Sequence, residues 1–390
     1  MVRVVHVSFS SRGGAGIAAT RIADAQRSHG IDSQALFQTH GTASTIALRA
    51  PLQFAQASGD FFFVRRNLKN PLFTLLRGGG SLDSEPLLSQ ADILHLHWIP
   101  GAVSLQFIEN RLDGGGRVAF TMHDMWPFTG GCHHRLTCEN LSQDCSGCPQ
   151  ARTRFAESVI AAATRKRELL THPLMAVSAP SEWMAAELRA AVPELSKASV
   201  IPNPVNTELF HPVPASKTAR EFVLAICAAD LSVPTKQVVD FTRQLEESRS
   251  EFGKPIRLLA IGRRLPRELS ALNWVTHVEP GSERQLARLL ATSDVLVSPS
   301  LVESFGYTVA EAGSCGTPAV VLGGSAVGEL VAPSQSGEIA TSLKQMVEVL
   351  VHLSHHPEDI QDMGDAAREL AEQHFGFARV AKKFASLYDV

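Results

Sequence analysis

The 390-residue chain lacks three features that would each point to a class of protein: an excess of charge, a long apolar run and an Asp-x-Asp pair. Its 36 Lys and Arg residues nearly balance 39 Asp and Glu residues, and the net charge of −3 argues against nucleic-acid binding. No apolar run is long enough to span a bilayer, and no secretion leader precedes the first apolar segment, so we expect a cytoplasmic protein. The missing Asp-x-Asp pair argues against a divalent metal ion in the chemistry.

The length of the chain indicates two domains, because 390 residues exceed what one ordinary core accommodates. Apolar segments of strand length alternate with helical patterns, which predicts an α/β protein with two Rossmann-like, doubly wound domains. Prolines and asparagines in PNPVNTELFHPVP make a stiff, non-helical segment, and we place a linker there, at residues 202–219. The predicted domains cover residues 1–201 and 220–375, and a terminal helix follows at 376–390.

The most informative stretch runs from residue 298 to residue 320 and reads SPSLVESFGYTVAEAGSCGTPAV. An apolar run ends in a Ser-Pro-Ser turn, a short helix follows, and a second apolar run begins after Gly316 and Pro318. The start of such a helix, outside the carboxyl end of a strand, offers backbone N–H groups to an anion. We expect these groups to come from Ser304, Phe305, Gly306, Tyr307 and Thr308.

Two carboxylates accompany this predicted anion site. Glu303 lies in the loop and Glu311 lies about two turns into the helix, so they can flank the anion from different heights. Carboxylates accept hydrogen bonds from hydroxyls, so the combination suits a nucleotide diphosphate sugar, with phosphates in the middle and a polyol at each end. Solvated surface glutamates without a ligand are the alternative.

A glycine-rich turn follows the first predicted strand, residues 2–9. Gly13 and Gly14 allow a tight turn and the close approach of a ligand to the backbone. The full dinucleotide fingerprint is absent, so nicotinamide binding is not supported. A tight turn without a ligand explains the glycines equally well.

Histidines stand at two predicted strand ends. His95 and His97 share one face of a strand and could bind a metal, but no third ligand follows at a recognisable spacing, so we favour hydrogen-bonded histidines. His123 and Asp124 follow the strand at 118–122, which places a polar pair at a strand carboxyl end. A histidine that caps a local turn is the alternative for His123.

The most unusual feature is a cluster of four cysteines within seventeen residues: Cys132, Cys138, Cys145 and Cys148. Four thiolates satisfy a tetrahedral zinc ion, and Cys145-x-x-Cys148 has the usual chelating spacing. Disulfides are rare in cytosolic proteins, so we predict a structural zinc ion, with a neighbouring histidine able to replace one sulfur. A redox-active Cys-x-x-Cys pair is the alternative.

The two glutamates, separated by seven residues and with Ser-Phe-Gly directly after the first, resemble the motif of the group 1 retaining glycosyltransferases. The resemblance covers nearly the whole chain and implies the GT-B fold, in which two Rossmann-like domains face a cleft and the terminal helix crosses back to the first domain. It implies transfer of a sugar from a nucleotide diphosphate sugar to an acceptor hydroxyl with retention of configuration.

A second resemblance narrows the family. The run HDMW from His123, followed by CSGCP from Cys145, resembles a subset that includes colanic-acid and capsule enzymes. It implies a role in the biosynthesis of bacterial surface polysaccharide, with a sugar or lipid-linked acceptor.

The resemblance also implies roles for single residues. It implies that His123 contacts the donor sugar, that Glu303 holds the transferred sugar and that Glu311 binds the nucleotide ribose. It further implies that Gly13 and Gly14 face the donor phosphates and the acceptor.

Neutralisation of the leaving diphosphate is assigned to Lys236 and to the helix start near Glu303. The family pairs this Lys with an Arg about five residues earlier, where the present chain has Ala229-Asp230-Leu231. Arg263 and Arg264, at the exit of the next strand, are candidate replacements, and solvated surface charges are the alternative.

Residues 61–77 interleave apolar side chains with Arg65, Arg66, Lys69 and Arg77. Such a mixture can lie on an anionic membrane surface, which would put the protein at the inner face of the plasma membrane. A helix that covers the core with solvated cations is the alternative, and we favour it.

Two other functions fit part of this pattern. A nucleotide-sugar epimerase of similar fold would bind the same donor, but we identify no buried acid and base for it. A non-catalytic subunit that binds a nucleotide sugar would explain the missing Arg.

Overall fold

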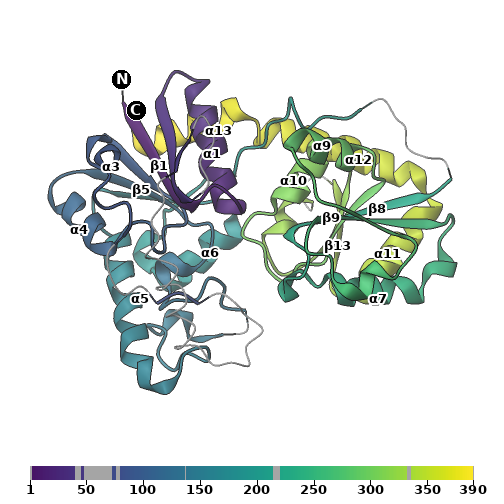
Figure 1. Cartoon of the computed structure of the whole chain (residues 1–390), viewed down its shortest axis with the longest axis horizontal. Helices are drawn as coiled ribbons and strands as arrows, with labels where there is room; N and C mark the ends of the chain where they lie inside the picture. The colour runs from purple at the N-terminus through teal and green to yellow at the C-terminus, as the bar shows by residue number, and fades with distance from the viewer. Residues whose placement is uncertain are drawn as a thin grey trace. The chain divides into compact units, whose positions relative to one another are not determined.

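The computed structural model describes residues 2–39, 45–47, 73–75, 80–136, 138–213, 220–331 and 335–389. Contacts divide the chain into two compact units. In Figure 1 the first is coloured from purple to teal, with its terminal helix in yellow, and the second from green to yellow. Unit 1 comprises Met1–Pro204 with Phe377–Val390, and unit 2 comprises Val205–Gly376. Arg65, Arg66, Lys69 and Arg77 of the predicted cationic segment lie outside the described residues.

Unit 1 is built on a parallel sheet with the strand order β3-β2-β1-β4-β5-β6-β7. Its strands are β1 (Arg3–Ser10), β2 (Asp32–Thr39), β3 (Thr45–Ala47), β4 (Ile93–Leu96), β5 (Arg117–Thr121), β6 (Met175–Ala179) and β7 (Ser199–Val200). Its helices are α1 (Gly14–Arg27), α3 (Pro86–Gln90), α4 (Leu105–Asp113), α5 (Ala156–Leu170), α6 (Glu182–Ala191) and α13 (Phe377–Tyr388). Both faces of this sheet carry apolar side chains. On β2, Leu36 joins the main core while Ala35 and Phe37 pack against Ala19 and Ala23 of α1.

Unit 2 is built on a second parallel sheet, with the order β10-β9-β8-β11-β12-β13. Its strands are β8 (Phe222–Asp230), β9 (Ile256–Arg263), β10 (Val275–Val278), β11 (Val295–Ser298), β12 (Ala319–Leu322) and β13 (Gly337–Ala340). Its helices are α7 (Val238–Glu247), α8 (Arg267–Ser270), α9 (Glu283–Ala291), α10 (Tyr307–Ser314), α11 (Leu343–His355) and α12 (Pro357–His374). On β8, Leu224 and Ile226 join one core while Ala225 joins the other. A strand buried on both faces reads as a continuous apolar run, which explains FVLAICA.

The predicted fold class, two Rossmann-like α/β domains, is confirmed by these two parallel sheets. Among the described helices, none is long and apolar enough to cross a bilayer.

Serine side chains begin four of the helices that the structure describes. In each case the hydroxyl accepts a hydrogen bond from the backbone N–H three residues later, which satisfies a donor that the helix itself leaves unpaired. The four N-caps are Ser104, Ser181, Ser282 and Ser342.

Residues 205–213 of the predicted linker pack onto unit 2, while residues 202–204 belong to unit 1. Val205 and Phe210 are fully buried, and the Val205 N–H donates to the Phe375 carbonyl at 2.9 Å. The Arg368 guanidinium donates to the Phe210 carbonyl at 2.9 Å. Residues 205–213 therefore belong to the second unit and are not a free spacer, while residues 214–219 lie outside the described chain.

The terminal helix α13 belongs to unit 1, where Figure 1 shows it in yellow beside α1 in purple. Its Tyr388 is 1% exposed, and the hydroxyl accepts a hydrogen bond from the Gln26 amide of α1 at 3.1 Å. Unit 1 is thus assembled from two parts of the chain that are far apart in sequence.

Candidate functional site

The strand order of unit 2 reverses between β8 and β11, and ligands of open α/β sheets bind at the carboxyl ends of strands at such a point. The loops that leave these two strands are tied together. The Leu301 N–H donates to the Thr235 carbonyl at 2.9 Å, and the Gln237 amide donates to the Pro299 carbonyl at 2.9 Å. One backbone and one side-chain hydrogen bond therefore hold the two loops together at the place where a ligand is expected.

Lys236 and Glu303, one from each of these loops, form an ion pair. The Lys236 Nζ lies 2.5 Å from the Glu303 Oε1, and the two side chains are 27% and 22% exposed. A hydrogen bond between two ionised groups is stronger than one between neutral groups, and it fixes both side chains. The sequence predicts these residues separately, and the structure brings them together.

Gly306 ends the loop and caps α10. Its φ of 96° lies in the left-handed region, and an added Cβ would stand 2.6 Å from the Val327 Cγ1, so a side chain fits here neither conformationally nor sterically. Phe305 is 3% exposed and packs edge-on against Tyr307 and Phe375. The Phe305 side chain is thus part of the core, and what it can offer a ligand is its backbone. Ser304 and Thr308 are half-buried.

Glu311 lies inside α10 and is 4% exposed, so it is not a solvated surface charge. The pKa of the neighbouring Cys227, on β8, responds to the charges around it. Its burial and the nearby carboxylates of Glu311 and Glu303 raise the pKa of the Cys227 thiol, while Lys236 acts in the opposite direction. All three predicted charged residues therefore act on the carboxyl-terminal end of β8.

The two arginines proposed as replacements for the missing one differ in their contacts. Arg263, which is exposed at the end of β9, donates from Nε to the Ala229 carbonyl at 3.1 Å. Arg264 forms an ion pair with Asp230. Burial disfavours the Asp230 carboxylate, but hydrogen bonds from Ser232 and the Arg264 charge outweigh it and lower the Asp230 pKa. Arg264 is therefore committed to Asp230, and Arg263 remains the candidate.

In unit 1, the predicted glycine turn forms the start of α1. Gly13 has a φ of 83° and is the N-cap residue, and a Cβ on Gly13 or Gly14 would meet no atom within 4 Å. Gly16 is different, because a Cβ there would stand 2.1 Å from the Ser10 carbonyl oxygen. The first two glycines therefore leave open space at the helix start, and the third allows the helix to pack closely on the strand.

His123 follows β5, as predicted, and is 9% exposed. Its Nε2 lies 2.8 Å from the Nδ1 of His97. Burial lowers the pKa of His123 to about 4, despite the nearby Asp124 carboxylate, so the imidazole is neutral at pH 7.

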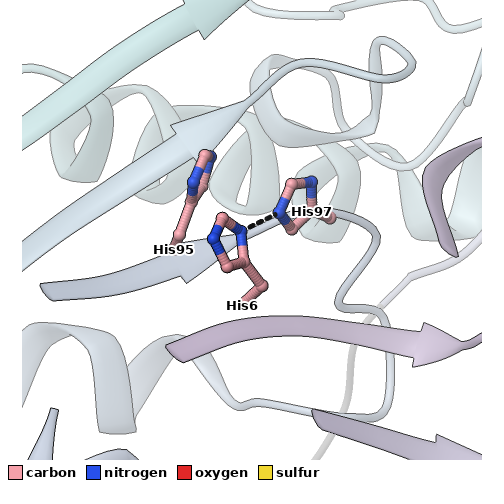
Figure 2. Close-up of side chains that lie close together, drawn as sticks. All are labelled: His6, His95 and His97. Atoms are coloured by element: carbon pink, nitrogen blue, oxygen red, sulfur yellow. Dashed lines mark hydrogen bonds between the residues drawn. The ribbon is translucent and has the colours of Figure 1, made fainter. Parts of the chain in front are cut away.

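A third histidine, which the sequence pattern does not reveal, joins His95 and His97. His6 lies opposite His95 in the β1–β4 register, and ligand atoms of the three rings lie within 4.8 Å of one another. Figure 2 shows the His6–His97 hydrogen bond, with a length of 2.9 Å, and the His95 ring beside it. All six ring nitrogens have partners, which are Gln26, Tyr388, Thr121, His123 and the histidines themselves. The arrangement is therefore a hydrogen-bonded network, and it leaves no ring nitrogen over for a metal ion.

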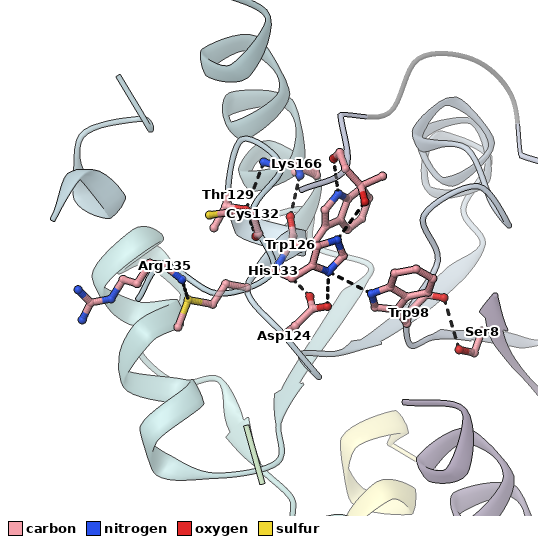
Figure 3. Close-up of polar contacts among 12 residues, drawn as sticks. Ser8, Trp98, Asp124, Trp126, Thr129, Cys132, His133, Arg135 and Lys166 are labelled. Atoms are coloured by element: carbon pink, nitrogen blue, oxygen red, sulfur yellow. Dashed lines mark hydrogen bonds and ion pairs between the residues drawn. The ribbon is translucent and has the colours of Figure 1, made fainter. Parts of the chain in front are cut away.

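Asp124 holds the following loop. Its Oδ2 lies 2.6 Å from the His133 Nδ1, as Figure 3 shows, and its Oδ1 accepts a hydrogen bond from the Trp126 N–H at 2.9 Å. Burial disfavours the carboxylate, but His133, His134 and the Trp126 N–H together outweigh this effect and lower the Asp124 pKa. The hydrogen bonds of Asp124 therefore orient His133 and Trp126, whereas the sequence suggests a pairing with His123.

The four clustered cysteines are free thiols that line one pocket of unit 1. Cys132 and Cys145 are buried, and the Cys145 Sγ accepts a hydrogen bond from the Gly130 N–H at 3.2 Å. Burial and the neighbouring thiols raise the pKa of Cys132 to about 12. Among the described residues, the sets of three ligand atoms within 4.8 Å of one another contain no cysteine. The pocket therefore offers four sulfur ligands, and their Sγ atoms would have to come closer together to share one ion.

Two family models match the chain. One, described as "Glycosyl transferases group 1", matches residues 223–356, and the other, "Glycosyltransferase Family 4", matches residues 12–209. Together they cover both units, including the Lys236–Glu303 pair and His123.

Curated relatives are similar over part of their length. The MMP alpha-(1->4)-mannosyltransferase of Mycolicibacterium hassiacum is 30% identical over 49% of this chain and 47% of its own length. A D-inositol 3-phosphate glycosyltransferase of Stackebrandtia nassauensis is 26% identical over 57% of this chain and 54% of its own. The chain thus spans about half the length of the curated relatives it matches.

Solved structures share the fold over the whole chain. HepE of Anabaena, in complex with UDP and glucose, has a TM-score of 0.66 at 17% identity, with full coverage of both chains. Sucrose-phosphate synthase of Thermosynechococcus elongatus has a TM-score of 0.67 at 18% identity, covering 100% of this chain and 98% of its own.

Proposed function

Because the chain belongs to the group 1 glycosyltransferases, we propose that it moves a sugar from a nucleotide diphosphate sugar to an acceptor hydroxyl with retention of anomeric configuration. The observation that carries this proposal is the Lys236–Glu303 pair beside the buried Glu311, at the switch point of the unit 2 sheet. The Lys236 cation and the start of α10 would bind the phosphates there. The two carboxylates would accept hydrogen bonds from hydroxyls of the donor.

When the diphosphate leaves, the site residues must stabilise the charge that develops on it. Negative charge grows on the leaving phosphate in the transition state, and pre-positioned cations and N–H groups stabilise it without reorganisation. Lys236 and the first N–H groups of α10, from Ser304 to Thr308, supply these groups, with Arg263 as a second cation. Glu303 holds Lys236 in place before the donor arrives.

The remaining site residues take the two ends of the donor. We assign the transferred sugar to Glu303 and His123, and the nucleotide ribose to Glu311. Gly13 and Gly14 leave room beside the start of α1 for the donor phosphates or the acceptor. Support for a nucleoside diphosphate sugar comes from HepE, which shares the fold and was solved with UDP and glucose.

The proposal is tested first with the donor. A thermal-shift screen of UDP, GDP, ADP and dTDP sugars should show stabilisation by one nucleotide class, since a ligand that binds the folded state raises its stability. The selected donor is then incubated alone and with sugar acceptors, and the anomeric configuration of the product is read by proton NMR. Slow donor hydrolysis without acceptor and a retained anomer with acceptor support the proposal. An epimerised donor would support the epimerase instead, and binding without any turnover would support a non-catalytic subunit.

We propose in addition that Cys132, Cys138, Cys145 and Cys148 bind one structural zinc ion. All four line one pocket, and the Gly130 N–H already donates to the Cys145 sulfur, as expected of the hydrogen bonds that orient metal ligands. A bound zinc ion would cross-link the segment between residues 132 and 148 and take no part in sugar transfer.

Elemental analysis tests the zinc proposal directly. The purified chain should contain close to one zinc per molecule, and Cys138→Ser should lose it. Cys315→Ser, which changes a buried cysteine of unit 2, is the matched control and should keep the zinc. Four freely titratable thiols without zinc would contradict the proposal, and a Cys145–Cys148 disulfide would support the redox alternative.

The acceptor is proposed to be a sugar or a lipid-linked sugar of surface polysaccharide, reached at the inner face of the plasma membrane. The support is in the sequence: the cations of residues 61–77 and the HDMW and CSGCP runs. Sedimentation with anionic liposomes should fall with salt and in the triple variant of Arg65, Arg66 and Lys69 to Gln. Equal sedimentation of the variant and the parent would dispose of the membrane contact.

A further inference from the structure

A continuous chain of hydrogen bonds crosses the interior of unit 1 and ends at His123. Its seven links join side chains from different elements, with donor–acceptor distances from 2.5 to 3.1 Å. In order, its members are Ser178, Thr121, His95, Tyr388, Gln26, His6, His97 and His123. The first seven are no more than 2% exposed, so water does not compete for these hydrogen bonds.

The Gln26 amide gives this chain a direction. Its Oε1 lies 2.9 Å from the His6 Nε2, and its Nε2 donates to the Tyr388 hydroxyl at 3.1 Å. An amide oxygen accepts and never donates, so His6 must carry its proton on Nε2. Tyr388, which receives the amide N–H, is left to donate its own O–H to the His95 Nδ1.

A neutral imidazole has one donor and one acceptor nitrogen, so the direction passes from ring to ring. His6 with a proton on Nε2 accepts at Nδ1, and the donor is the His97 Nε2 at 2.9 Å. His97 then accepts at its own Nδ1, and the donor is the His123 Nε2 at 2.8 Å. His123 is therefore protonated on Nε2, and its Nδ1 is the acceptor.

The rings must be neutral for this alternation to hold, and burial keeps them so. It lowers the pKa of His6 and of His123 to about 4, and it lowers the pKa of His95 and of His97 well below the ordinary value. At pH 7 each ring carries one proton.

We propose that Gln26, His6 and His97 are positioning residues that hold His123 as the Nε2–H tautomer and present its Nδ1 as a hydrogen-bond acceptor. Within the described part of the chain, the His123 Nδ1 makes no hydrogen bond. A ring nitrogen that accepts a hydrogen bond selects a ligand group that donates one. On a nucleotide sugar such a group is a hydroxyl, and a phosphate oxygen is excluded. This last step rests on the proposed function, in which the hydroxyl belongs to the donor sugar, whereas the tautomer itself does not depend on that function.

Gln26→Met tests the relay, because a thioether of similar size replaces the amide oxygen that faces the His6 Nε2–H with a far weaker acceptor. A buried N–H without an acceptor costs more than a bare ring nitrogen, so His6 should move its proton to Nδ1. The change then passes through His97, and His123 should switch from the Nε2–H to the Nδ1–H tautomer. Long-range proton–nitrogen correlation spectra of the 15N-histidine-labelled full chain distinguish the two forms. The His123 signal is identified by its loss in His123→Gln.

Tyr388→Phe is the second variant, and it keeps the ring while removing the hydroxyl. The Gln26 amide then loses the acceptor of its N–H, which favours the reversed amide and again the Nδ1–H form of His123. Ser8→Ala is the control, since Ser8 is a buried hydroxyl on the same strand as His6 but outside the chain of hydrogen bonds. It should leave the His123 tautomer unchanged.

Turnover separates this relay from the proposed function. Where the tautomer switches, kcat with the intact donor should fall roughly 10-fold while the affinity for the nucleoside diphosphate stays the same. A switched tautomer with parental kcat would uphold the relay and remove His123 from the transfer reaction. A parent His123 in the Nδ1–H form, or a tautomer that neither Gln26→Met nor Tyr388→Phe changes in a folded variant, would overturn the relay.

Discussion

The Lys236–Glu303 pair of unit 2 is charged and partly exposed, whereas three histidines of unit 1, on β1, on β4 and directly after β4, are neutral and buried. Lys236 and Glu303 have side chains that are 27% and 22% exposed, while His6, His95 and His97 are no more than 2% exposed. Charged groups within reach of water can exchange one partner for another, so they can meet an arriving diphosphate. Neutral groups in a dry core cannot, and their hydrogen bonds fix proton positions instead. Under the two proposals above, unit 2 presents charge to the donor and unit 1 fixes the position of a proton.

The largest effect is expected from the charges of unit 2. Lys236→Ala and Glu303→Ala should each lower kcat with the intact donor roughly 10²- to 10³-fold, because each removes a group placed for the transition state. The double variant should lose less than the product of the two, since the residues contact each other. Glu303→Ala should keep nearly parental affinity for the nucleoside diphosphate. Arg243→Ala, which breaks an exposed ion pair with Asp240, should have the kcat of the parent. Fully multiplicative losses would show that the pair does not act as a unit.

The next effect concerns the nucleotide. Glu311→Ala should weaken binding of the nucleoside diphosphate by about 10- to 150-fold, because a charge-assisted hydrogen bond to the ribose contributes about 1.5 to 3 kcal/mol. Calorimetric titration of the parent, Glu311→Ala and Glu303→Ala with the nucleoside diphosphate measures this affinity. Glu348→Ala, which changes an exposed glutamate of unit 2, controls for the loss of a carboxylate. Parental affinity in a folded Glu311→Ala would remove this residue from the nucleotide site.

Acid should weaken unit 1 through its histidines. His6 and His123 titrate near pH 4 in the folded chain and near 6.5 when unfolded, so between these values the unfolded state binds more protons. The free energy of unfolding should therefore fall as the pH drops from 7 to 5, by on the order of 1–2 kcal/mol per histidine, and urea denaturation at several pH values measures this fall. His6→Gln should flatten the dependence, and the exposed His29→Gln should not. A dependence as steep in His6→Gln as in the parent would contradict this assignment.

The smallest effect is expected from Arg263. It is exposed, so water screens its charge, and Arg263→Gln should lower kcat by less than about 5-fold. Arg264→Gln is the matched comparison, because it breaks the pair with Asp230 and lies one residue away. A loss of 100-fold or more in Arg263→Gln would make Arg263 the full replacement for the missing arginine.

Local patterns in the sequence predict much of this molecule, because each depends on neighbours within a few residues. The loop and helix around Gly306 are of this kind. The parallel β8 is another, since burial on both faces produces an uninterrupted apolar run.

Contacts between distant residues could not be predicted in the same way. Lys236 and Glu303 are 67 residues apart, and the local sequence around one residue does not indicate that it contacts the other. His6 meets His95 because β1 pairs with β4, and that pairing is a property of the sheet order. A strand pattern shows which face a side chain shares, but it does not show which strand lies beside it. The prolines of the predicted linker indicate a stiff backbone, but they do not indicate that Val205 and Phe210 are buried.

The return of α13 to unit 1 sets an order of events during synthesis. The ribosome makes residues 1–204 first and all of unit 2 next, and only then Tyr388, whose hydroxyl links Gln26 to His95. Until that residue emerges, Gln26 and His95 each lack one buried hydrogen-bond partner, and the first unit to be translated is the last to be completed. A nascent chain that is stalled or cut anywhere between residues 205 and 387 therefore carries a first domain with an incomplete interior. Incompletely folded domains are substrates of cellular proteases.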